Sequence, residues 1–415
     1  MATDINRVVV TGIGSVTPIG IGVESFWNGL IAGKNGISRV TRFDPTGFRS
    51  QMAAEVKDFV PEDWIEKKSV DRMDRFTQFA IAASTQAMKD AGLDVFQFDP
   101  ARAGIIVGSG IGGIATMEES HRKLLEKGPK SVNPFLVSKF LINMAACNVS
   151  IRYGLKGPIS APSMACSTGA NAIGDAFRII QRGDADIMLA GSSEAAVSPL
   201  AYGGFCATRS MSVNPVPEKA SRPFDLNRDG FVMGEGAGIV VLESLAHAAR
   251  RGAKIYAELA GYGNTADAYH VTAPEPSGDG MTRVMAAALR DASVDPGEVQ
   301  YINAHGTSTD MNDKIESAAI LKVFGGHSEA LKVSSNKSMI GHLLSAAGAV
   351  EFIATVMSVR SGVVPPTINY ETPDPDCPLD YVTRGAESMD FRIAISNSFG
   401  FGGGNACLVV RKYEG

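Results

Sequence analysis

The pattern of apolar and polar positions predicts buried strands that alternate with amphipathic helices. Unbroken apolar runs within residues 7–14, 103–113 and 185–195 are typical of strands buried on both faces. Residues 23–32 and 71–91 instead place apolar side chains three and four positions apart, which predicts helices. Strands alternating with helices in this way indicate an α/β layered fold.

The same alternation starts again at about Lys254 and suggests a repeated unit. Residues 231–243 and 399–411 share one order, in which glycines precede a terminal apolar strand. Self-similarity of this kind predicts an internal duplication. We divide the chain into an N-terminal half, residues 1–253, and a C-terminal half, residues 254–415.

Glycines and turn residues predict the irregular connections. Asn227–Gly230 has turn chemistry, and with the alternating glycines after it predicts a hairpin whose second strand is Ile239–Leu242. Residues 202–212 have the composition of a glycine-rich loop. Residues 392–413 predict a closing hairpin at the end of the chain.

The stretch Ser160–Gly183 combines tiny residues with a helical repeat. Small side chains surround Cys166, and apolar residues then recur at helical spacing as far as Gly183, a typical C-terminal cap. The helix is expected to begin at or just after Cys166, where unpaired N–H groups and the helix dipole favour a thiolate. Cysteine is often inert core material, but its small neighbours here leave space for a reactant.

Two of the six histidines stand where catalysis is plausible. His305 follows an apolar strand and precedes small hydroxyl residues, and His342 follows Gly341 and precedes a helix. A single such histidine is more often structural, but two of them with a cysteine at a helix start suit nucleophilic chemistry. Two neutral imidazoles aimed at one point can stabilise a developing enolate.

Four charged residues near these histidines leave two interpretations open. Lys337 and Glu351 flank the second histidine, and Asp313 and Glu316 follow the first, one helical turn apart. Such residues usually form surface salt bridges. The functional interpretation is an outer layer of contacts that fixes the orientation and charge of the imidazoles.

Composition excludes several classes of function. The 415 residues are 45% hydrophobic and 20% charged, an ordinary globular balance, and the net charge of −5 argues against nucleic-acid binding. The five cysteines contain no C-x-x-C pair, so neither a disulfide framework nor a metal site is expected, and a reducing, cytoplasmic compartment fits. With no apolar signal region and no long apolar run, neither export nor a membrane span is expected.

A glycine cluster keeps one different class of enzyme open. Gly108, Gly110 and Gly113 satisfy the G-x-G-x-x-G pattern of nicotinamide-dinucleotide sites. No second strand with an acidic end follows, and residues 117–128 predict a polar helix instead. The competing interpretation is that these glycines let the backbone pack closely beside a ligand tunnel. A nicotinamide-binding oxidoreductase is therefore kept as an alternative.

In this order and spacing, the motifs resemble the elongating β-ketoacyl-acyl-carrier-protein synthases, condensing enzymes of the thiolase-like superfamily. The resemblance covers nearly the whole chain and rests on SMACSTG around Cys166, NAHGTST around His305, NKSMIGHLLSAAGAVE around His342 and NSFGFGG at residues 397–403. It implies a thiolase-like duplicated five-layer αβαβα fold and a homodimer. The GSGIGG motif is most similar to the synthase II type.

The resemblance also implies a reaction. Cys166 would accept an acyl chain from acyl carrier protein, and malonyl-carrier protein would then lose carbon dioxide while His305 and His342 stabilise the enolate. The carbanion would attack the acyl carbonyl, whose oxygen would accept the backbone N–H groups of Cys166 and Phe399. Lys337 would complete the catalytic set. The substrate-binding residues would be Ile111, Phe205, Thr307, Thr309, Gly402 and Gly403.

Acyl carrier protein and acyl and malonyl thioesters are the partners that the resemblance implies. Carrier proteins are acidic, so a local basic patch is expected despite the negative total charge. Its candidate residues are Lys67, Lys68, Arg72, Lys127, Lys130 and Arg209. No cofactor or metal is expected, and a structural monovalent cation near Asn303 and Asn397 stays open.

Three positions depart from the family pattern. Met164 replaces a common threonine, Gly404 replaces a threonine or histidine, and Asp310 stands where proline is common. The first could reshape the acyl pocket and the second could loosen the loop beside it, so the acyl-chain preference is open. A polyketide-type ketosynthase remains the alternative within the same class, whereas a non-catalytic chain-length factor would lack Cys166.

Overall fold

A single large sheet crosses the protein. The computed structural model describes residues 5–94 and 98–415, and within them the sheet has 11 strands, ten of them in the order β12-β11-β15-β16-β10-β1-β9-β7-β5-β6. The first half contributes β1 (Val8–Thr17), its short partner β2 (Gly20–Ile21), β5 (Ala103–Gly108), β6 (Ile159–Ser160), β7 (Ile187–Glu194) and β9 (Gly236–Ser244). The second half contributes β10 (Ala257–Ala266), β11 (Tyr301–Asn303), β12 (Lys332–Ser334), β15 (Ile393–Gly400) and β16 (Gly404–Arg411).

The two halves of the sheet repeat one topology. Outward from β1 come β9, β7, β5 and β6, and outward from β10 come β16, β15, β11 and β12. In each set the first two pairings are antiparallel and the outer two are parallel. The bulges repeat as well: a Cβ at Gly12 or Gly261 would lie 2.2 or 2.5 Å from a helix carbonyl oxygen, an approach that only glycine permits. The predicted duplicated fold is confirmed.

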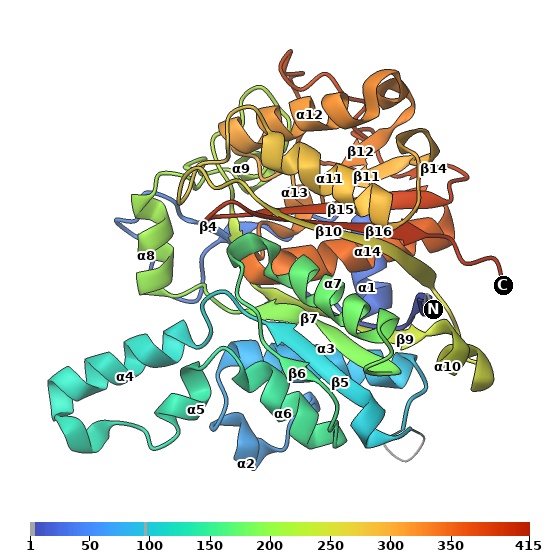
Figure 1. Cartoon of the computed structure of the whole chain (residues 1–415). Coiled ribbons are helices and arrows are strands. Elements are labelled where there is room, and N and C mark those ends of the chain that lie inside the picture. Colours follow the sequence, from blue (N-terminus) through green and yellow to red (C-terminus); the bar gives the residue numbers. More distant parts are fainter. Residues whose placement is uncertain (1–4, 95–97) are drawn as a thin grey trace.

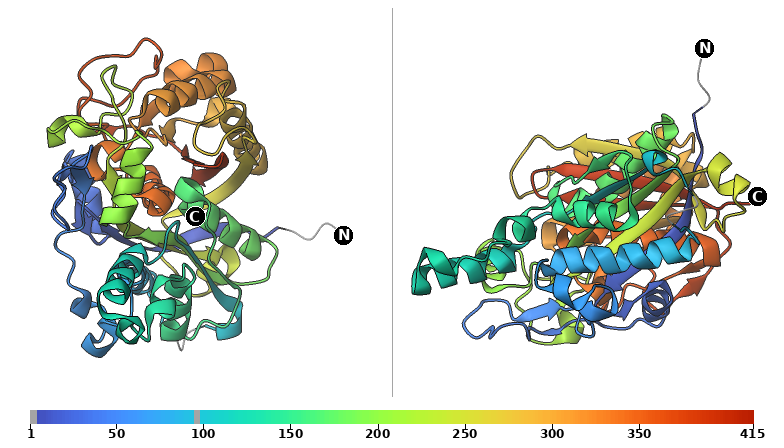
Figure 2. Two further views of the ribbon diagram at one scale, coloured as in Figure 1. Left: turned by 90° about the vertical axis from the view of Figure 1, so that its left-hand side faces the viewer. Right: turned by 90° about the horizontal axis from the view of Figure 1, so that it is seen from below.

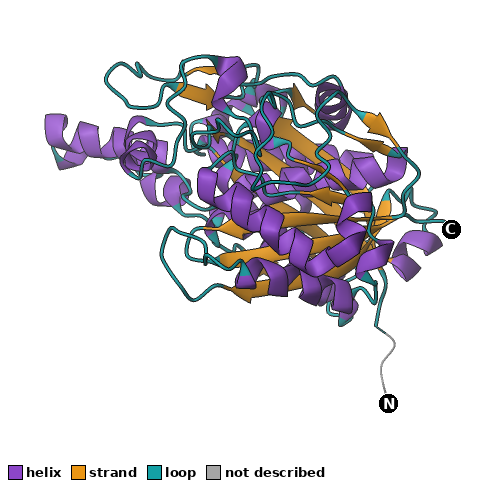
Figure 3. Ribbon diagram, turned by 90° about the horizontal axis from the view of Figure 1, so that it is seen from above, coloured by secondary structure: helices purple, strands orange, loops and turns teal. Residues whose placement is uncertain are grey.

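Helices fill the layers outside and between the two half-sheets (Figure 1). Helices α3 (Arg75–Asp90) and α6 (Met144–Tyr153) cover one outer face, and α11 (Asp279–Asp291) and α12 (Asp310–Phe324) lie on the opposite side. Helices α7 (Thr168–Gln181) and α14 (Ala347–Ser361) lie between the half-sheets. Figure 3 shows helices covering the sheet as seen from above. These are the five layers, αβαβα, that the family resemblance implied.

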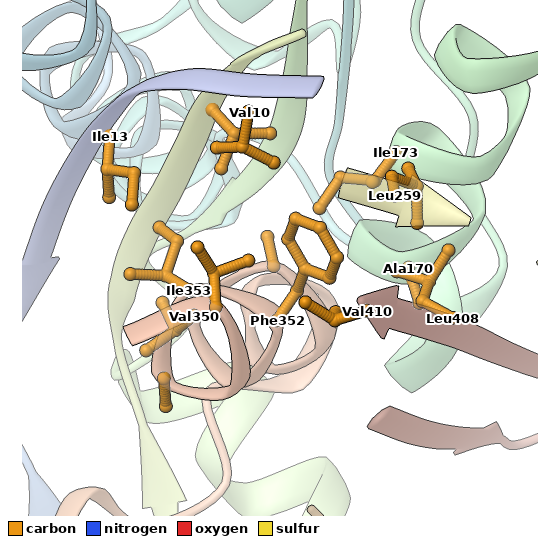
Figure 4. Close-up of a cluster of buried hydrophobic side chains, with 14 of the residues drawn as sticks. Val10, Ile13, Ala170, Ile173, Leu259, Val350, Phe352, Ile353, Leu408 and Val410 are labelled. Atoms are coloured by element: carbon orange, nitrogen blue, oxygen red, sulfur yellow. The ribbon is translucent and has the colours of Figure 1, made fainter. Parts of the chain in front are cut away.

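A hydrophobic core shared by both halves surrounds the central helices (Figure 4). Ile173 of α7 and Phe352 of α14 belong to one buried cluster with Val10 of β1, Leu259 of β10 and Val410 of β16. A helix that is apolar on every side belongs in the interior, and α14 is buried over most of its length. Burial of a side chain such as Phe352 contributes roughly 1.5–3 kcal/mol, so this core holds the two halves together.

The two central helices also begin side by side. A Cβ at Gly169 of α7 would lie 2.5 Å from the backbone nitrogen of Ala349, and one at Gly348 of α14 would lie 2.9 Å from that of Ala170. Only glycine allows two backbones to approach so closely. The residues that precede the two helices are therefore held at one point in the protein.

Shorter elements connect these layers. The first half adds α1 (Val23–Ile31), α2 (Lys67–Val70), α4 (Ile114–Lys127), α5 (Leu136–Phe140), α8 (Pro199–Ala207), α9 (Pro217–Ala220), α10 (Leu245–Arg250) and a small sheet of β3 (Ser38–Arg39), β4 (Met52–Ala54) and β8 (Met233–Gly234). The second half adds α13 (Lys337–Ile340), β13 (Val363–Val364) and β14 (Glu387–Ser388). Helices α4 and α5 project from the body as an arm (Figures 1 and 2). Within the described ranges, no helix is both long enough and apolar enough to cross a bilayer.

Two local predictions are wrong and one boundary shifts. Strand β8 pairs with β4, whereas β9 pairs with β1 and β7, because buried Glu235 between them binds Arg75 and interrupts the expected hairpin. The glycine-rich residues 202–212 contain most of α8, whose start is set by Pro199 in its first turn. Helix α3 begins at Arg75 because the Asp74 carboxylate caps it.

Candidate active site

Cys166 lies in a tight turn immediately before a central helix. Residues 165–167 form a 3-10 turn, and α7 begins at Thr168, as predicted. Ala165 has a φ of 46°, in the left-handed region that non-glycine residues rarely adopt. The turn is held because the Thr168 hydroxyl accepts the Met164 N–H (2.8 Å) and donates to the Ala165 carbonyl (2.7 Å). The sulfur is thus placed by a strained but well-bonded backbone.

One cavity brings the cysteine and both histidines together. It has a volume of about 390 Å³ and is lined by Cys166, His305, His342 and Phe399, among others. The His305 and His342 ring centres lie 5.4 Å apart, and the Phe399 ring centre lies 5.6 Å from that of His305. The two imidazoles come from the far half of the chain, so the central layers assemble the site.

Lys337 fixes the orientation of His305. Its ammonium group donates to the His305 carbonyl oxygen (2.6 Å) and to the ring Nδ1 (3.3 Å), and it forms an ion pair with Glu351. Because Nδ1 accepts this bond, the ring proton lies on Nε2. All three groups are buried, so the surface interpretation of Lys337 and Glu351 is wrong.

Glu316 and Asp313 hold the backbone of the His305 loop. The Glu316 carboxylate accepts the N–H groups of His305 and Gly306, each at 2.8 Å. Asp313 accepts the N–H of Phe224 at 2.9 Å and is also bonded by the N–H of Thr307. Both carboxylates are fully buried, and both position the loop rather than touch an imidazole ring.

Burial sets the protonation of the reactive groups. Desolvation, followed by the charge of Lys337, lowers the pKa of His305 and of His342 well below its usual value, so both rings are neutral. Desolvation also raises the pKa of the Cys166 thiol to about 11, against the opposing effects of the Phe401 N–H and Lys337. The expected thiolate is thus corrected: the closed cavity outweighs the helix dipole, and the resting sulfur carries its proton.

The backbone group beside the sulfur belongs to Phe401 rather than Phe399. The Phe401 N–H is the hydrogen-bond donor that lowers the pKa of Cys166, whereas Phe399 is paired with Asn405 inside the β15–β16 hairpin. The Phe399 ring still lines the cavity. The prediction of Phe399 as the backbone donor is therefore wrong, and the donor lies two residues later in the Phe-Gly-Phe-Gly sequence.

The predicted substrate-binding residues divide into two groups. Phe205, Thr307 and Thr309 line the cavity. Ile111 does not line it, but packs against the same hydrophobic cluster as Phe205, which also contains the cavity residues Phe231 and Leu344.

The two predicted loop glycines, Gly402 and Gly403, do not line the cavity. The Gly402 N–H donates to the Val271 carbonyl and the Gly403 N–H to that of Gly400. Their φ angles of 85° and 75° show that they are needed for the turn. Gly400 instead lies beside the nucleophile, since a Cβ there would be 3.3 Å from the Cys166 nitrogen.

The candidate basic residues are all exposed, but they do not form a single cluster. Lys67 and Lys68 lie in α2, and Lys68 pairs with Glu66. Arg72 lies over the Phe135 ring, which belongs to the arm. Lys127 and Lys130 lie at the far end of α4 and in the turn after it, and Arg209 lines the cavity.

The Gly108–Gly113 cluster is closely packed and offers no dinucleotide site. A Cβ at Gly108 would lie 2.4 Å from a Thr168 methyl group, and one at Gly113 would lie 2.6 Å from a carbonyl oxygen. The Gly110 N–H donates to the carboxylate of buried Glu194 at 2.9 Å. A pyrophosphate would meet that carboxylate instead of free N–H groups, so the oxidoreductase hypothesis is wrong.

Sequence comparison decides the family. A family profile described as "Beta-ketoacyl synthase, N-terminal domain" matches residues 5–248, and one described as "Beta-ketoacyl synthase, C-terminal domain" matches residues 256–371. The chain belongs to the beta-ketoacyl synthase family. This beta-ketoacyl synthase is 52% identical over 408 residues to a 3-oxoacyl-[acyl-carrier-protein] synthase 2 of Staphylococcus aureus (strain COL), covering 98% of this chain and 99% of the relative. It is 49% identical to one of Synechocystis sp., covering 98% of each chain.

Solved structures show the same fold. The ishigamide ketosynthase/chain length factor superimposes on this beta-ketoacyl synthase with a TM-score of 0.93 at 39% identity, over 99% of this chain and 100% of the other. A type II PKS ketosynthase in complex with its acyl-carrier protein gives 0.92 at 40% identity, with the same coverage. A beta-ketoacyl synthase from Burkholderia phymatum gives 0.92 at 37% identity, again with that coverage.

Proposed function

We propose that this beta-ketoacyl synthase catalyses the decarboxylating Claisen condensation of malonyl-acyl carrier protein with a cysteine-bound acyl chain, which forms 3-oxoacyl-acyl carrier protein in fatty-acid elongation. The observation that carries this proposal is the cavity lined by buried Cys166 and by two buried, neutral imidazoles. A thiol beside a proton acceptor suits acyl transfer, and neutral N–H donors suit an enolate oxygen.

In the first step, the Cys166 sulfur attacks the carbonyl carbon of an acyl thioester. Because the resting thiol is protonated, a neutral imidazole takes its proton as the S–C bond forms. The carbonyl oxygen accepts the backbone N–H groups of Cys166 and Phe401. The bond to the carrier thiol then breaks, and that sulfur leaves with the proton.

In the second step, a malonyl thioester enters the emptied cavity. Its C–C bond to the carboxylate breaks, carbon dioxide leaves, and the electron pair forms an enolate whose oxygen accepts N–H bonds from His305 and His342. The enolate carbon attacks the acyl carbonyl, and Cys166 departs as a thiolate that takes up a proton from solvent. Lys337 keeps His305 oriented for this step, since it fixes the ring proton on Nε2.

The partner surface and assembly follow from the exposed residues. An acidic carrier protein suits Arg209 at the cavity, with Lys67, Lys68, Arg72, Lys127 and Lys130 as outer contacts. A homodimer is supported by β6, an edge strand whose two residues are exposed, and by the neighbouring apolar side chains of Ile151 and Ile159. A cytoplasmic location is supported by the five free cysteines.

The residues near Asn303 and Asn397 fit a structural monovalent cation. Buried Oδ1 atoms of both asparagines and the Oε2 of Glu351 have no hydrogen-bond partner among the described residues. Strands β11 and β15 are neighbours, with Asn303 opposite Ser396, so the two asparagines lie on adjacent strands within one residue of register. Hard oxygen ligands of this kind suit an alkali cation, which would neutralise the carboxylates beneath the histidines.

Fatty-acid elongation is favoured over polyketide synthesis by similarity. The relatives named 3-oxoacyl-[acyl-carrier-protein] synthase 2 are 49% and 52% identical to this chain, whereas the polyketide ketosynthase structures are 39% and 40% identical. The polyketide alternative would require a partner subunit or modular neighbours.

The test is removal of the nucleophile. Cys166→Ala should abolish formation of 3-oxoacyl-carrier protein, measured by mass analysis of products from acyl- and malonyl-carrier protein, with a loss of at least about 10³-fold. Cys147→Ala is the matched control, since that thiol lies outside the cavity lining and should leave turnover unchanged. Full turnover by Cys166→Ala would contradict the proposal.

A further inference from the structure

Both ends of the loop beside Cys166, at Gly400 and Gly404, contact the turn that carries Cys166. A Cβ at Gly400 would lie 2.7 Å from the Met164 carbonyl oxygen, and one at Gly404 would lie 2.8 Å from the Met164 Cε. The two residues are the last pair of the β15–β16 hairpin before its turn. Met164 therefore touches the loop at its beginning through the backbone and at its end through the thioether.

The backbone does not require glycine at position 404. Gly402 and Gly403 have φ angles of 85° and 75°, which favour glycine, but Gly404 has no left-handed φ. Besides the Met164 Cε, the next atom near a Cβ at position 404 is the Ser167 hydroxyl oxygen, at 3.6 Å. The space above Gly404 is thus taken by one side chain, the Met164 thioether.

Met164 cannot make room by moving its backbone. Its N–H donates to the Thr168 hydroxyl at 2.8 Å, and its carbonyl accepts the Ser167 N–H at 3.1 Å and the Ser167 hydroxyl at 2.9 Å. The side chain is 42% exposed, so only the thioether end is free to rotate. A side chain at position 404 must therefore displace either that thioether or the start of β16.

We propose that Met164 and Gly404 act as one steric pair that sets how closely the Gly400–Gly403 loop rests on Cys166. The two positions are coupled because the long side chain at 164 occupies the volume that a side chain at 404 would need. Through the loop the pair positions the Phe401 N–H beside the sulfur, and so it controls the rate at which long acyl chains reach Cys166. This role rests on the proposed function.

A double-mutant cycle tests the pair with two readouts. Met164→Thr, Gly404→Thr and the double variant are compared for acyl transfer from a long-chain acyl-carrier protein to Cys166, and for alkylation of Cys166 by iodoacetamide. Gly404→Thr alone should slow acyl transfer about 10-fold. Met164→Thr should change it less than about 3-fold, and the double variant should return to within about 3-fold of the parent. The alkylation rate of Cys166 should change in Gly404→Thr and return toward the parent value in the double variant.

Controls separate the pair from folding and from the proposed function. Gly297→Thr places the same side chain where nothing lies within 4 Å and should leave both rates unchanged. If Gly404→Thr does not fold, Gly404→Ala replaces it in the same cycle. Equal losses from Gly404→Thr in the parent protein and in the Met164→Thr variant would overturn the pair. A different result is that the parent protein shows no acyl transfer while the alkylation rates of the four proteins still show coupling between positions 164 and 404. That result would overturn the proposed function but would support the steric pair.

Discussion

The turns before the two central helices have the same backbone conformation but carry different side chains. The first turn has Ala165 with a φ of 46° and then Cys166, and the second has Leu344 with a φ of 52° and then Ser345. Each is followed by a helix whose early glycine touches the other helix. One turn therefore carries the nucleophile, and its counterpart carries a hydroxyl.

What differs is the residue at the end of the strand beside each turn. Strand β7 ends in Glu194, whose carboxylate accepts the Ser345 hydroxyl at 2.6 Å. Strand β15, its counterpart in the second half, ends in Gly400, which leaves the space beside Cys166 without a side chain. The same strained turn thus serves as a fixed support in one half and as a reactive position in the other.

The largest expected effect concerns the imidazoles that make the first turn reactive. His305→Ala or His342→Ala should slow malonyl decarboxylation by roughly 10²–10³-fold, because each removes an N–H donor to the enolate oxygen. Release of carbon dioxide from malonyl-carrier protein measures this step directly. His121→Ala, on the exposed arm helix α4, is the control, and an unchanged rate in His305→Ala would remove the role of that ring.

A second substitution places a side chain beside Cys166, as Glu194 does beside Ser345. Gly400→Ala places a Cβ 2.7 Å from the Met164 carbonyl oxygen and 3.3 Å from the Cys166 nitrogen. Acylation of Cys166 should fall by about 10²-fold, because the loop donor is displaced from the carbonyl oxygen it serves. The rate of acyl transfer measured by intact-protein mass analysis checks this. An unchanged rate of acylation would mean that Cys166 does not need the space left by Gly400 at the end of β15.

A third change tests the fixed turn through pH. Burial raises the pKa of Glu194 from 4.5 to about 7, so the folded protein holds a proton that the unfolded chain has lost over that range. The free energy of unfolding should therefore decrease as pH rises from about 4.5 to 7, and this carboxyl contributes roughly 3 kcal/mol to the change.

Glu194→Gln should remove that part of the dependence. Urea unfolding at pH 5 and pH 8 of the parent and the variant isolates it, since Glu316 and Glu351 titrate alike in both proteins. Ser345→Ala serves as the matched variant, because it leaves the carboxyl in place: the Ser345 hydroxyl lowers the pKa of Glu194, so its removal should enlarge the pH dependence rather than abolish it. Identical pH dependence in the parent and in Glu194→Gln would contradict this account.

The smallest effect is expected outside both turns. Reversing Lys67 and Lys68 to Glu should raise the KM for an acidic carrier protein a few-fold and weaken its salt dependence, with kcat preserved, because exposed charges mainly steer association. Reversal of Lys156, which is also exposed, is the control for net charge. An unchanged KM would exclude this part of the surface.

Local patterns predicted the alternating strands and helices, the duplication, and Cys166 with the two histidines, whereas the five layers were implied by the family resemblance. Helical periodicity located α7 directly after Cys166, and alternating strands and helices predicted the duplicated halves. The failures depend on tertiary contacts. The pKa of Cys166 follows from how completely the cavity excludes water, and the choice between Phe399 and Phe401 follows from the register of a hairpin.

One signal in the sequence was present but not used. Residues 165–170, ACSTGA, and residues 344–349, LSAAGA, share the spacing from turn to glycine, and aligning them would have paired Cys166 with Ser345. The role of Glu194 could not have been found this way, because its partners come from two distant segments of the chain, residues 109–110 and Ser345.

The close approach of α7 and α14 at two glycines fixes the reacting groups in the innermost layer of the fold. Since those two backbones meet at Gly169 and Gly348, the relative placement of sulfur and imidazoles is settled in the innermost layer, remote from the projecting arm. An exchange of residues 114–140 between relatives is therefore expected to leave the placement of the sulfur and the imidazoles unchanged. The same close approach makes either glycine a point at which one added methyl group would force the starts of α7 and α14 apart and shift the cysteine relative to the histidines.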